Sequence, residues 1–310
     1  MRTLIVITGP TAVGKTEICL DIAKRYHIPI INADSRQIYR GMVIGTAAPT
    51  MEQLAAVKHY FVGMLSPDKY YNASMFEQDV TKVLHELWGN FQGCSQDKHS
   101  RQLALMCGGS MMYIDSVCDG IDDIPTIHPE TRAMIRDKYE KDGLERLLEE
   151  LKLLDPEYYD VVDKRNQRRV VHGLEICYQT GKTYTSFRKR EKIARPFDRL
   201  IKIFINRSRE QLYKRINTRV DRMIENGLEA EVRSLENYRG VNALNSVGYR
   251  EMFDYIDEKI TLNEAVEKIK SNTRRYARKQ QTWYKRDENI RWFDAEDKES
   301  IIEYIENAVR

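Results

Sequence analysis

Short apolar runs alternate with amphipathic helical stretches along the first third of the chain. Four brief runs predict buried strands, at residues 4–8, 28–34, 59–65 and 102–107. The helical stretch after the first run places Ile18, Ile22 and Tyr26 on one face, with Cys19 and Ala23 beside them. This alternation predicts an α/β fold whose parallel sheet is covered by helices on both sides.

The pattern changes near residue 121. Residues 121–196 show helical periodicity without a strand signal, and a further strand is expected at 200–205, followed by a helix from Ser208. We therefore predict a core in two parts, residues 1–120 and 197–310 with its C-terminal helices, interrupted by a helical insertion at 121–196.

Two capping boxes mark further helix starts. Ser74 with Glu77 predicts a helix to about Asn90, and Thr261 with Glu264 predicts one to about Lys285.

Composition narrows the class of protein. A chain of 310 residues suits about two domains, and no apolar run approaches the roughly 18 residues that span a membrane. The N-terminus predicts a first strand, not a secretory signal. The chain has five scattered cysteines, Cys19, Cys94, Cys107, Cys118 and Cys177. Their odd number and their spacing disfavour a disulfide framework or a zinc site and favour a reducing cytoplasm.

Charge is more informative in its distribution than in its total of +3. Residues 163–195 hold ten Lys or Arg against three acids, and residues 273–291 hold seven against two. Two basic clusters on a nearly neutral chain indicate a polyanionic partner such as nucleic acid. Solvated helix faces are the alternative explanation.

The strongest motif is GPTAVGKT at residues 9–16, which fits the phosphate-loop pattern between a strand and a helix. Gly9 and Gly14 permit close backbone approach, and the loop amides with the helix N-terminus bind anionic oxygens. Lys15 adds a point charge, and Thr16 offers a hydroxyl to Mg²⁺. The loop alone predicts a phosphorylated ligand without saying which. A second GKT, at 181–183, lacks the first glycine and predicts a helix end at Gly181.

Asp34 is the best-placed acid, at the carboxyl edge of a predicted strand. The strand at 102–107, by contrast, ends in glycines and offers no magnesium-binding acid. Asp34 is open to three interpretations: a magnesium anchor, a general base or a turn former.

Two helices carry further candidates. Arg215, Arg219 and Arg222 share one face, which suits either a phosphate clamp or an exposed, ion-paired surface. The stretch 273–286 interleaves aromatics with cations, which suits stacking on unpaired bases. For Trp283 in this stretch, a place on the buried helix face is favoured.

Taken together, these residues resemble a known family. GPTAVGKT, ADSRQIYRGMVIGTAAP, CGGSMMY, GLEICYQTGKT, RINTRVDRMIENGLEAEV, SVGYRE and TRRYARKQQTW occur in one order over nearly the whole chain. The combination resembles the bacterial tRNA dimethylallyltransferases (tRNA isopentenyltransferases).

The resemblance implies a fold, a reaction and partners. The fold is a P-loop-kinase-like parallel core with a helical insertion that grips the anticodon stem-loop of tRNA. The reaction transfers the dimethylallyl group from dimethylallyl diphosphate to N6 of the adenosine immediately 3′ of the anticodon, and releases diphosphate. Mg²⁺ is the implied cofactor, and a cytoplasmic monomer is expected.

The resemblance also implies roles for individual residues. Asp34 corresponds to the general base, Arg219 to a residue that stabilises the leaving diphosphate, and Thr11 to one near the reacting centre. The diphosphate is held by Gly9, Pro10, Thr11, Ala12, Val13, Gly14, Lys15 and Thr16, with Mg²⁺ near Thr16. The expected tRNA contacts are Asp34, Ser35, Arg36, Gln37, Ser110, Arg132, Arg168, Arg169, Val170, Val171, His172, Asn245, Ser246, Val247, Gly248, Tyr249 and Arg250.

The sequence departs from the family pattern at Ala48, where many relatives have lysine, and at His172, where many have arginine. Weaker tRNA contacts are the expected result, with Arg168 and Arg169 compensating. Three alternatives remain: an adenylate isopentenyltransferase, a small-molecule P-loop kinase, and an RNA-binding module with a vestigial loop. The first two have no need of the basic insertion, and intact Lys15, Thr16 and Asp34 disfavour the third.

Overall fold

The computed structural model describes residues 1–89, 102–122, 124–188 and 194–309. The chain forms two compact units, a core unit of Met1–Asp119 with Ala194–Arg310 and a helical unit of Gly120–Ile193.

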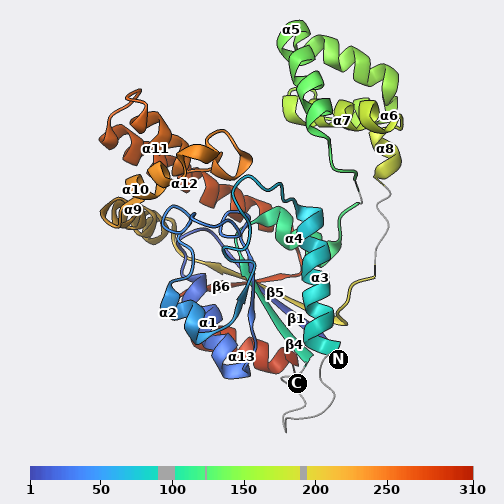
Figure 1. The fold of residues 1–310 in the computed structure, drawn as a ribbon. Helices are drawn as coiled ribbons and strands as arrows, with labels where there is room; N and C mark the ends of the chain where they lie inside the picture. The colour runs from blue at the N-terminus through green and yellow to red at the C-terminus, as the bar shows by residue number, and fades with distance from the viewer. Residues whose placement is uncertain (90–101, 123, 189–193, 310) are drawn as a thin grey trace. The chain divides into compact units, whose positions relative to one another are not determined.

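The core unit is built on a parallel six-stranded sheet (Figure 1). In spatial order its strands are β3 (His59–Tyr60), β2 (Ile30–Ala33), β4 (Leu103–Gly108), β1 (Thr3–Thr8), β5 (Arg199–Asn206) and β6 (Ile290–Asp294). All five neighbouring pairs are parallel. The predicted α/β fold class is therefore confirmed. Because the strands are parallel, their carboxyl ends meet at one edge, where ligands bind in such sheets.

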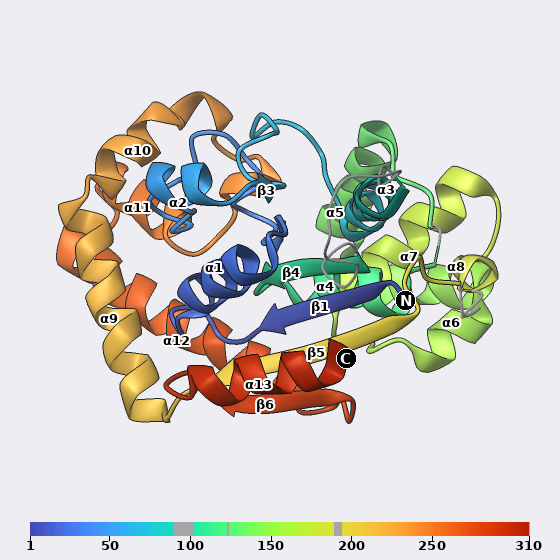
Figure 2. The same ribbon diagram turned by 90° about the horizontal axis from the view of Figure 1, so that it is seen from below.

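The alternation of side chains along β1 divides the core into two layers. Ile5 and Ile7 pack with α1 (Lys15–Tyr26), α13 (Lys298–Val309) and the first turns of α9 (Arg209–Glu225). Leu4 and Val6 belong to the larger cluster on the opposite face. That cluster takes in α3 (Ala73–Gly89), α4 (Met111–Asp119), α10 (Leu228–Ser234), α11 (Tyr249–Ile256) and α12 (Leu262–Tyr284). Figure 2 shows helices on both sides of the sheet.

The helical unit has a small core of its own. It contains α5 (Pro129–Leu154), α6 (Pro156–Val161), α7 (Gln167–Thr180) and α8 (Tyr184–Phe187). Helix α5 is interrupted at Gly143, whose φ of 77° is not helical. The buried residues that join these helices are Ile135, Leu147, Leu151, Tyr158, Val162, Val170 and Leu174.

Most predicted elements are present, with local corrections. Gly181 ends α7 in a left-handed conformation, and Thr261 caps α12 with Glu264, as predicted. The Ser74–Glu77 capping box was wrong: α3 begins at Ala73, and the Asn72 side chain accepts the Met75 N–H at 2.9 Å. Glu77 is instead ion-paired with Arg195. The predicted end at Asn90 lies outside the described residues.

The sheet edges also differ from expectation. The strand predicted at 59–65 is only two residues long, since Phe61 takes a positive φ of 63° and turns the chain away. Strand β6 was not predicted. The described part of the chain also contains the short elements α2 (Met51–Ala56) and the 3₁₀ turns Glu236–Tyr238 and Asn242–Leu244.

Candidate active site

The phosphate loop joins the carboxyl end of β1 to α1. A Cβ on Gly9 would lie 2.3 Å from the Ile205 carbonyl oxygen, so the loop packs against β5 only with glycine there. Gly14 has a φ of 112° at the start of α1, a conformation that also favours glycine. Lys15 Nζ donates to the carbonyl oxygens of Gly9 at 2.9 Å and Pro10 at 3.0 Å. These bonds hold the ammonium group against the loop.

Three arginines contact this loop, one directly after β5 and two on α9. Arg207 Nε donates to Val13 O at 2.9 Å, and Arg215 Nε donates to Ala12 O at 2.8 Å. Arg219 Nη1 donates to Thr11 Oγ1 at 3.2 Å, while its Nη2 donates to Thr46 O at 3.1 Å. Arg222 is exposed in the last turn of α9. Of the three α9 arginines that were expected to share one face, Arg215 and Arg219 contact the phosphate loop and Arg222 is exposed.

The electrostatics place Asp34 near the same loop. Burial lowers the pKa of Lys15 and of Arg219 below their ordinary values, because desolvation disfavours the charged forms. The negative charge of Asp34 opposes that lowering in both. The carboxylate thus lies within electrostatic reach of the two cations that flank the loop.

Asp34 also organises its own turn at the end of β2. Its Oδ1 accepts the backbone N–H of Arg36 at 2.8 Å and of Gln37 at 3.2 Å. The turn-former interpretation therefore describes one oxygen of the group. It does not compete with a chemical role, since a carboxylate has several acceptor positions.

The residues that follow Asp34 are tied to neighbouring segments. Ser35 N donates to Ser110 Oγ at 2.8 Å, and Ser110 Oγ donates to Ser35 Oγ at 3.1 Å. Arg36 Nη1 reaches Asn242 O at 2.8 Å. Gln37 Nε2 donates to Thr46 O at 3.0 Å, the same carbonyl that Arg219 contacts. The structure thus brings the predicted residues of segment 34–37 and Ser110 together beside the phosphate loop.

One carboxylate supports the loop at residues 43–47. Glu231 accepts the backbone N–H groups of Val43, Ile44 and Gly45 at 2.6–2.9 Å, and the Tyr249 hydroxyl at 2.7 Å. Burial and this carboxylate raise the pKa of Tyr249 well above its ordinary value. A Cβ on Gly45 would lie 2.7 Å from the Tyr249 ring. The side chain of Tyr249 is therefore structural.

The rest of segment 245–250 is divided between surface and core. Asn245 and Arg250 are exposed, Ser246 and Val247 are half-buried, and Gly248 is buried. Gly248 has a φ of 99°, and its N–H donates to Glu251 Oε2 at 2.8 Å. Asn245 and Arg250 are the side chains of this segment that a large partner can reach most easily.

Helix α12 presents several cations outward, while its aromatic residues differ in exposure. Arg275, Arg278 and Lys279 are exposed. Trp283 packs against the core and donates from Nε1 to Asp115 Oδ2 at 2.7 Å, which agrees with its expected place on the buried face. Tyr276 is 37% exposed, and its hydroxyl donates to Gly109 O at 3.3 Å.

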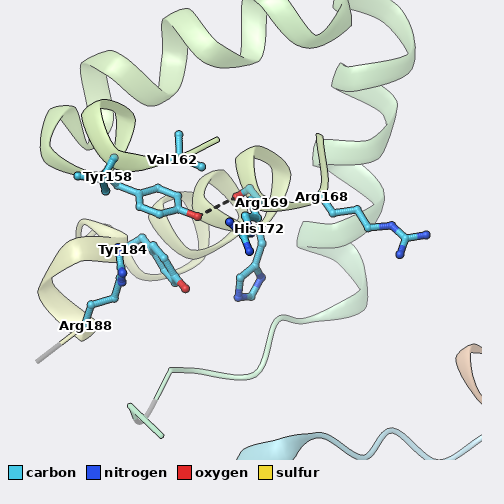
Figure 3. A pocket seen from close by; sticks show the side chains of 8 residues that line it. Tyr158, Val162, Arg168, Arg169, His172, Tyr184 and Arg188 are labelled. Carbon is cyan, nitrogen blue, oxygen red and sulfur yellow. Dashed lines mark hydrogen bonds between the residues drawn. The ribbon is translucent and has the colours of Figure 1, made fainter. Parts of the chain in front are cut away.

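The helical unit contains a pocket of about 590 Å³ between α6, α7 and α8 (Figure 3). Tyr158, Val161, Val162, Arg168, Arg169, His172, Tyr184 and Arg188 line it. His172 Nδ1 lies 3.3 Å from Glu175 Oε2, and its ring meets Tyr184 edge-on. Three arginines and aromatic rings suit an anionic, ring-bearing ligand.

The remaining predicted tRNA contacts of the helical unit differ in exposure. Val170 is fully buried and Val171 half-buried, so the arginines and His172 carry the polar surface of segment 168–172. Arg132 lies in the first turn of α5. Lys189, Arg190 and Lys192 of the first basic cluster lie outside the described residues.

Two cysteine thiols lie near Lys15. Cys19 of α1 and Cys107 of β4 are free thiols that interact with each other. The interaction with Cys19 and the charge of Lys15 lower the pKa of Cys107, whereas burial raises that of Cys19. Cys118 and Cys177 are also free, and Cys94 lies outside the described residues.

Sequence reasoning missed three polar residues that shape the site. Arg207 directly follows β5 at the carboxyl edge, and that position was a usable signal. Glu231 and Gln280 lie in segments that carry the family resemblance, but they act through contacts with segments far away in the sequence, which no local pattern indicates.

Comparisons with known proteins bear on this site. Residues 37–287 match the family described as IPP transferase. The chain belongs to the IPP transferase family. It is 53% identical over 305 residues to tRNA dimethylallyltransferase 1 of Bacteroides thetaiotaomicron, which covers 98% of this chain and 96% of the relative. It is 42% identical over 307 residues to the tRNA dimethylallyltransferase of Christiangramia forsetii, and the match covers 99% of this chain and 98% of that relative.

Solved structures of IPP transferases resemble this one. The tRNA isopentenylpyrophosphate transferase of Bacillus halodurans has a TM-score of 0.69 at 32% identity, covering all of this chain and 97% of that one. The structure of a eukaryotic dimethylallyltransferase acting on tRNA has a TM-score of 0.75 at 23% identity, and the match covers 95% of this chain and 74% of that one. The latter likeness is one of fold.

Neither a metal-binding cluster nor a membrane-spanning helix occurs among the described residues. In the described ranges, no cluster of three or more His, Cys, Asp or Glu could hold a metal ion by itself. Among the described helices, none is both long and apolar enough to cross a membrane.

Proposed function

We propose that this chain is a tRNA dimethylallyltransferase, which transfers the dimethylallyl group from dimethylallyl diphosphate to N6 of the adenosine 3′ of the anticodon and releases diphosphate. Family membership over nearly the whole chain supports the activity. The observation that carries the mechanism is that Asp34 lies within electrostatic reach of Lys15 and Arg219, the two cations beside the phosphate loop.

The residues suit the two halves of such a reaction. An exocyclic adenine amine is a poor nucleophile, so attack on C1 of the donor gains from a carboxylate that accepts the N6 proton. Asp34 is the proposed base. Charge grows on the diphosphate as the C1–O bond breaks, and Lys15, Arg219 and the loop amides stabilise that charge more in the transition state than in the ground state. Thr11, in the phosphate loop, accepts a hydrogen bond from Arg219.

Magnesium fits this site when dimethylallyl diphosphate is also bound, because the protein itself offers few ligands. Thr16, exposed in the first turn of α1, offers one hydroxyl. Mg²⁺ usually keeps several waters and takes few protein ligands beside substrate phosphates. When bound, the ion would add positive charge to the leaving diphosphate, while Lys15 and Arg219 hold the same group from the protein side.

The basic surfaces suit a tRNA anticodon stem-loop as the acceptor. Arg275, Arg278 and Lys279 on α12 and the arginines of the helical-unit pocket offer charge for phosphates. The target adenosine would have to leave the stacked loop to reach Asp34, which costs a few kcal/mol that stem contacts offset. A monomeric, cytoplasmic enzyme is part of this proposal.

A label-transfer assay separates this function from its rivals. Labelled dimethylallyl diphosphate is incubated with unmodified tRNA or AMP, and labelled ATP is tested separately with candidate acceptors. We expect label in tRNA alone. Label in AMP would identify an adenylate isopentenyltransferase, and phosphate transfer from ATP would identify a kinase.

A further inference from the structure

Gln280 is a polar side chain on the buried face of α12. Its neighbours on that face are Ala277, Tyr284, Ile269 and Ala265, and Gln280 itself is 1% exposed. A buried amide is costly unless its donor and acceptor are both satisfied. The partners of Gln280 therefore explain why a glutamine occupies this position.

The oxygen and the nitrogen of the Gln280 side-chain amide each form a hydrogen bond with a backbone group of the site. Thr11 N–H, in the phosphate loop, donates to Gln280 Oε1 at 2.9 Å. Gln280 Nε2 donates to Gly109 O at 2.8 Å, in the turn after β4. A Cβ on Gly109 would lie 2.5 Å from Nε2, so a glycine lets the amide approach this closely.

These two contacts belong to a longer chain of hydrogen bonds. On one side, Thr11 accepts from Arg219, which is proposed to stabilise the leaving diphosphate. On the other side, Gly109 precedes Ser110, whose Oγ accepts the backbone N–H of Ser35 at 2.8 Å. Ser35 follows Asp34 directly. Gln280 thus stands between the loop that would hold the leaving group and the turn that carries the proposed base.

We propose that Gln280 is a positioning residue that sets the phosphate loop at a fixed separation from the Asp34 turn. It acts through Thr11 and Gly109, by accepting from one and donating to the other. This inference rests on the proposed function, because separation matters only if both sides act in one step. A misplacement of about 1 Å in such a site lowers the rate about a hundredfold.

Two substitutions separate the donor and acceptor roles of this side chain. Gln280→Met keeps similar length and volume but removes both hydrogen bonds. Gln280→Glu keeps an acceptor for Thr11 N–H, while its ionised form cannot donate to Gly109 O. Protonation of that carboxyl group restores the donor. The control is Gln281→Met, since Gln281 is the next residue on α12 and bonds the Asn206 side chain instead.

The experiment measures single-turnover transfer to tRNA with enzyme in excess, over a range of pH. The rate constant at saturation reports positioning, whereas the amplitude reports the fraction of folded enzyme. We expect Gln280→Met to lower the rate constant about tenfold to a hundredfold at unchanged amplitude. For Gln280→Glu, the rate relative to wild type should rise as pH falls. The Gln281→Met variant should match wild type.

The outcomes distinguish this inference from the function on which it rests. If wild type transfers label to tRNA and Gln280→Met has the same rate constant, the positioning role is wrong while the function stands. A reduced amplitude at an unchanged rate constant would show that Gln280 serves only folding. A pH-independent ratio for Gln280→Glu would refute the need for the Gly109 bond. Absence of transfer by wild type would overturn the proposed function itself.

Discussion

Arg219 Nη1 donates to Thr11 Oγ1 at 3.2 Å, which joins the middle of α9 to the phosphate loop. Thr11 and Arg219 are 208 residues apart in the sequence. The second Arg219 nitrogen, Nη2, contacts Thr46 O, so the guanidinium is held from two sides. This fixed cation beside the loop amides is suited to charge that develops on a departing diphosphate.

Removal of this cation should affect the chemical step. We expect Arg219→Ala to lower kcat about a hundredfold to a thousandfold, the range typical of losing one preorganised donor to a developing anion. Steady-state kinetics with dimethylallyl diphosphate and tRNA measure it. Arg222→Ala, three residues along α9 and exposed, is the control and should retain wild-type kcat. Equal losses in both variants would contradict a specific role for Arg219.

The lowered pKa of Lys15 predicts a pH dependence of donor binding. A bound diphosphate favours the charged ammonium and so raises that pKa, which means that the protein takes up a proton on binding at alkaline pH. Affinity should therefore be full below the lowered pKa of the free protein and weaken as pH rises through it. Calorimetric titration with a non-reactive diphosphate analogue measures this trend.

The matched variant for that experiment is Lys15→Arg. A guanidinium stays protonated over the accessible range, so its affinity should not show the alkaline decline of wild type. The same decline in both proteins would assign the titration to another group.

The contacts of Glu231 lead to a prediction about the stability of the fold. It accepts three backbone N–H groups and the Tyr249 hydroxyl, so Glu231→Ala leaves four donors without this acceptor. We expect a loss of about 2–3 kcal/mol in the free energy of unfolding. The control is Glu229→Ala on the same helix, whose exposed pair with Arg233 should be worth less than about 0.5 kcal/mol. Similar urea midpoints for the two variants would contradict the supporting role of Glu231.

The arginines of the helical-unit pocket should contribute to tRNA affinity through phosphate contacts. Affinity for an anticodon stem-loop should fall steeply as salt rises, and Arg168→Ala should reduce the slope of log K against log salt by about one. Arg146→Ala should leave the slope unchanged, since Arg146 is ion-paired with Glu149 at 2.7 Å. A flat salt response in wild type would be inconsistent with the basic clusters as the tRNA surface.

Local sequence patterns were enough to predict most strands and helices of the parallel core, because the residues that signal each element are neighbours in the sequence. The apolar run before GPTAVGKT predicts β1, and Thr261 with Glu264 predicts the start of α12. Where two local signals competed, the prediction was wrong: Asn72 caps α3 in place of Ser74. Strand β6 was missed because its pairing is non-local, with Trp292 packed on Phe204 of β5.

The candidate site was predictable only where a motif or a resemblance carried it. Asp34 directly follows β2, and Lys15 begins α1 after the loop at the end of β1, so both lie at the carboxyl edge where function concentrates in α/β sheets. Glu231 and Gln280 fall within segments that carry the family resemblance, but no pattern in those segments marks their contacts. Both residues lie on helices that reach the site only through the tertiary fold. The burial of Val170 and Tyr249 within predicted tRNA-contacting segments likewise depends on packing that a linear pattern does not show.

Asp34→Asn tests most directly the claim that this carboxylate is the base opposite a loop that holds the leaving group. The asparagine oxygen can still accept the Arg36 and Gln37 N–H groups, so the turn should persist. The measurement is the single-turnover rate of label transfer from dimethylallyl diphosphate to tRNA. We predict a rate about a hundredfold to ten-thousandfold below wild type, with anticodon stem-loop affinity within about threefold. A rate equal to that of wild type would contradict the account.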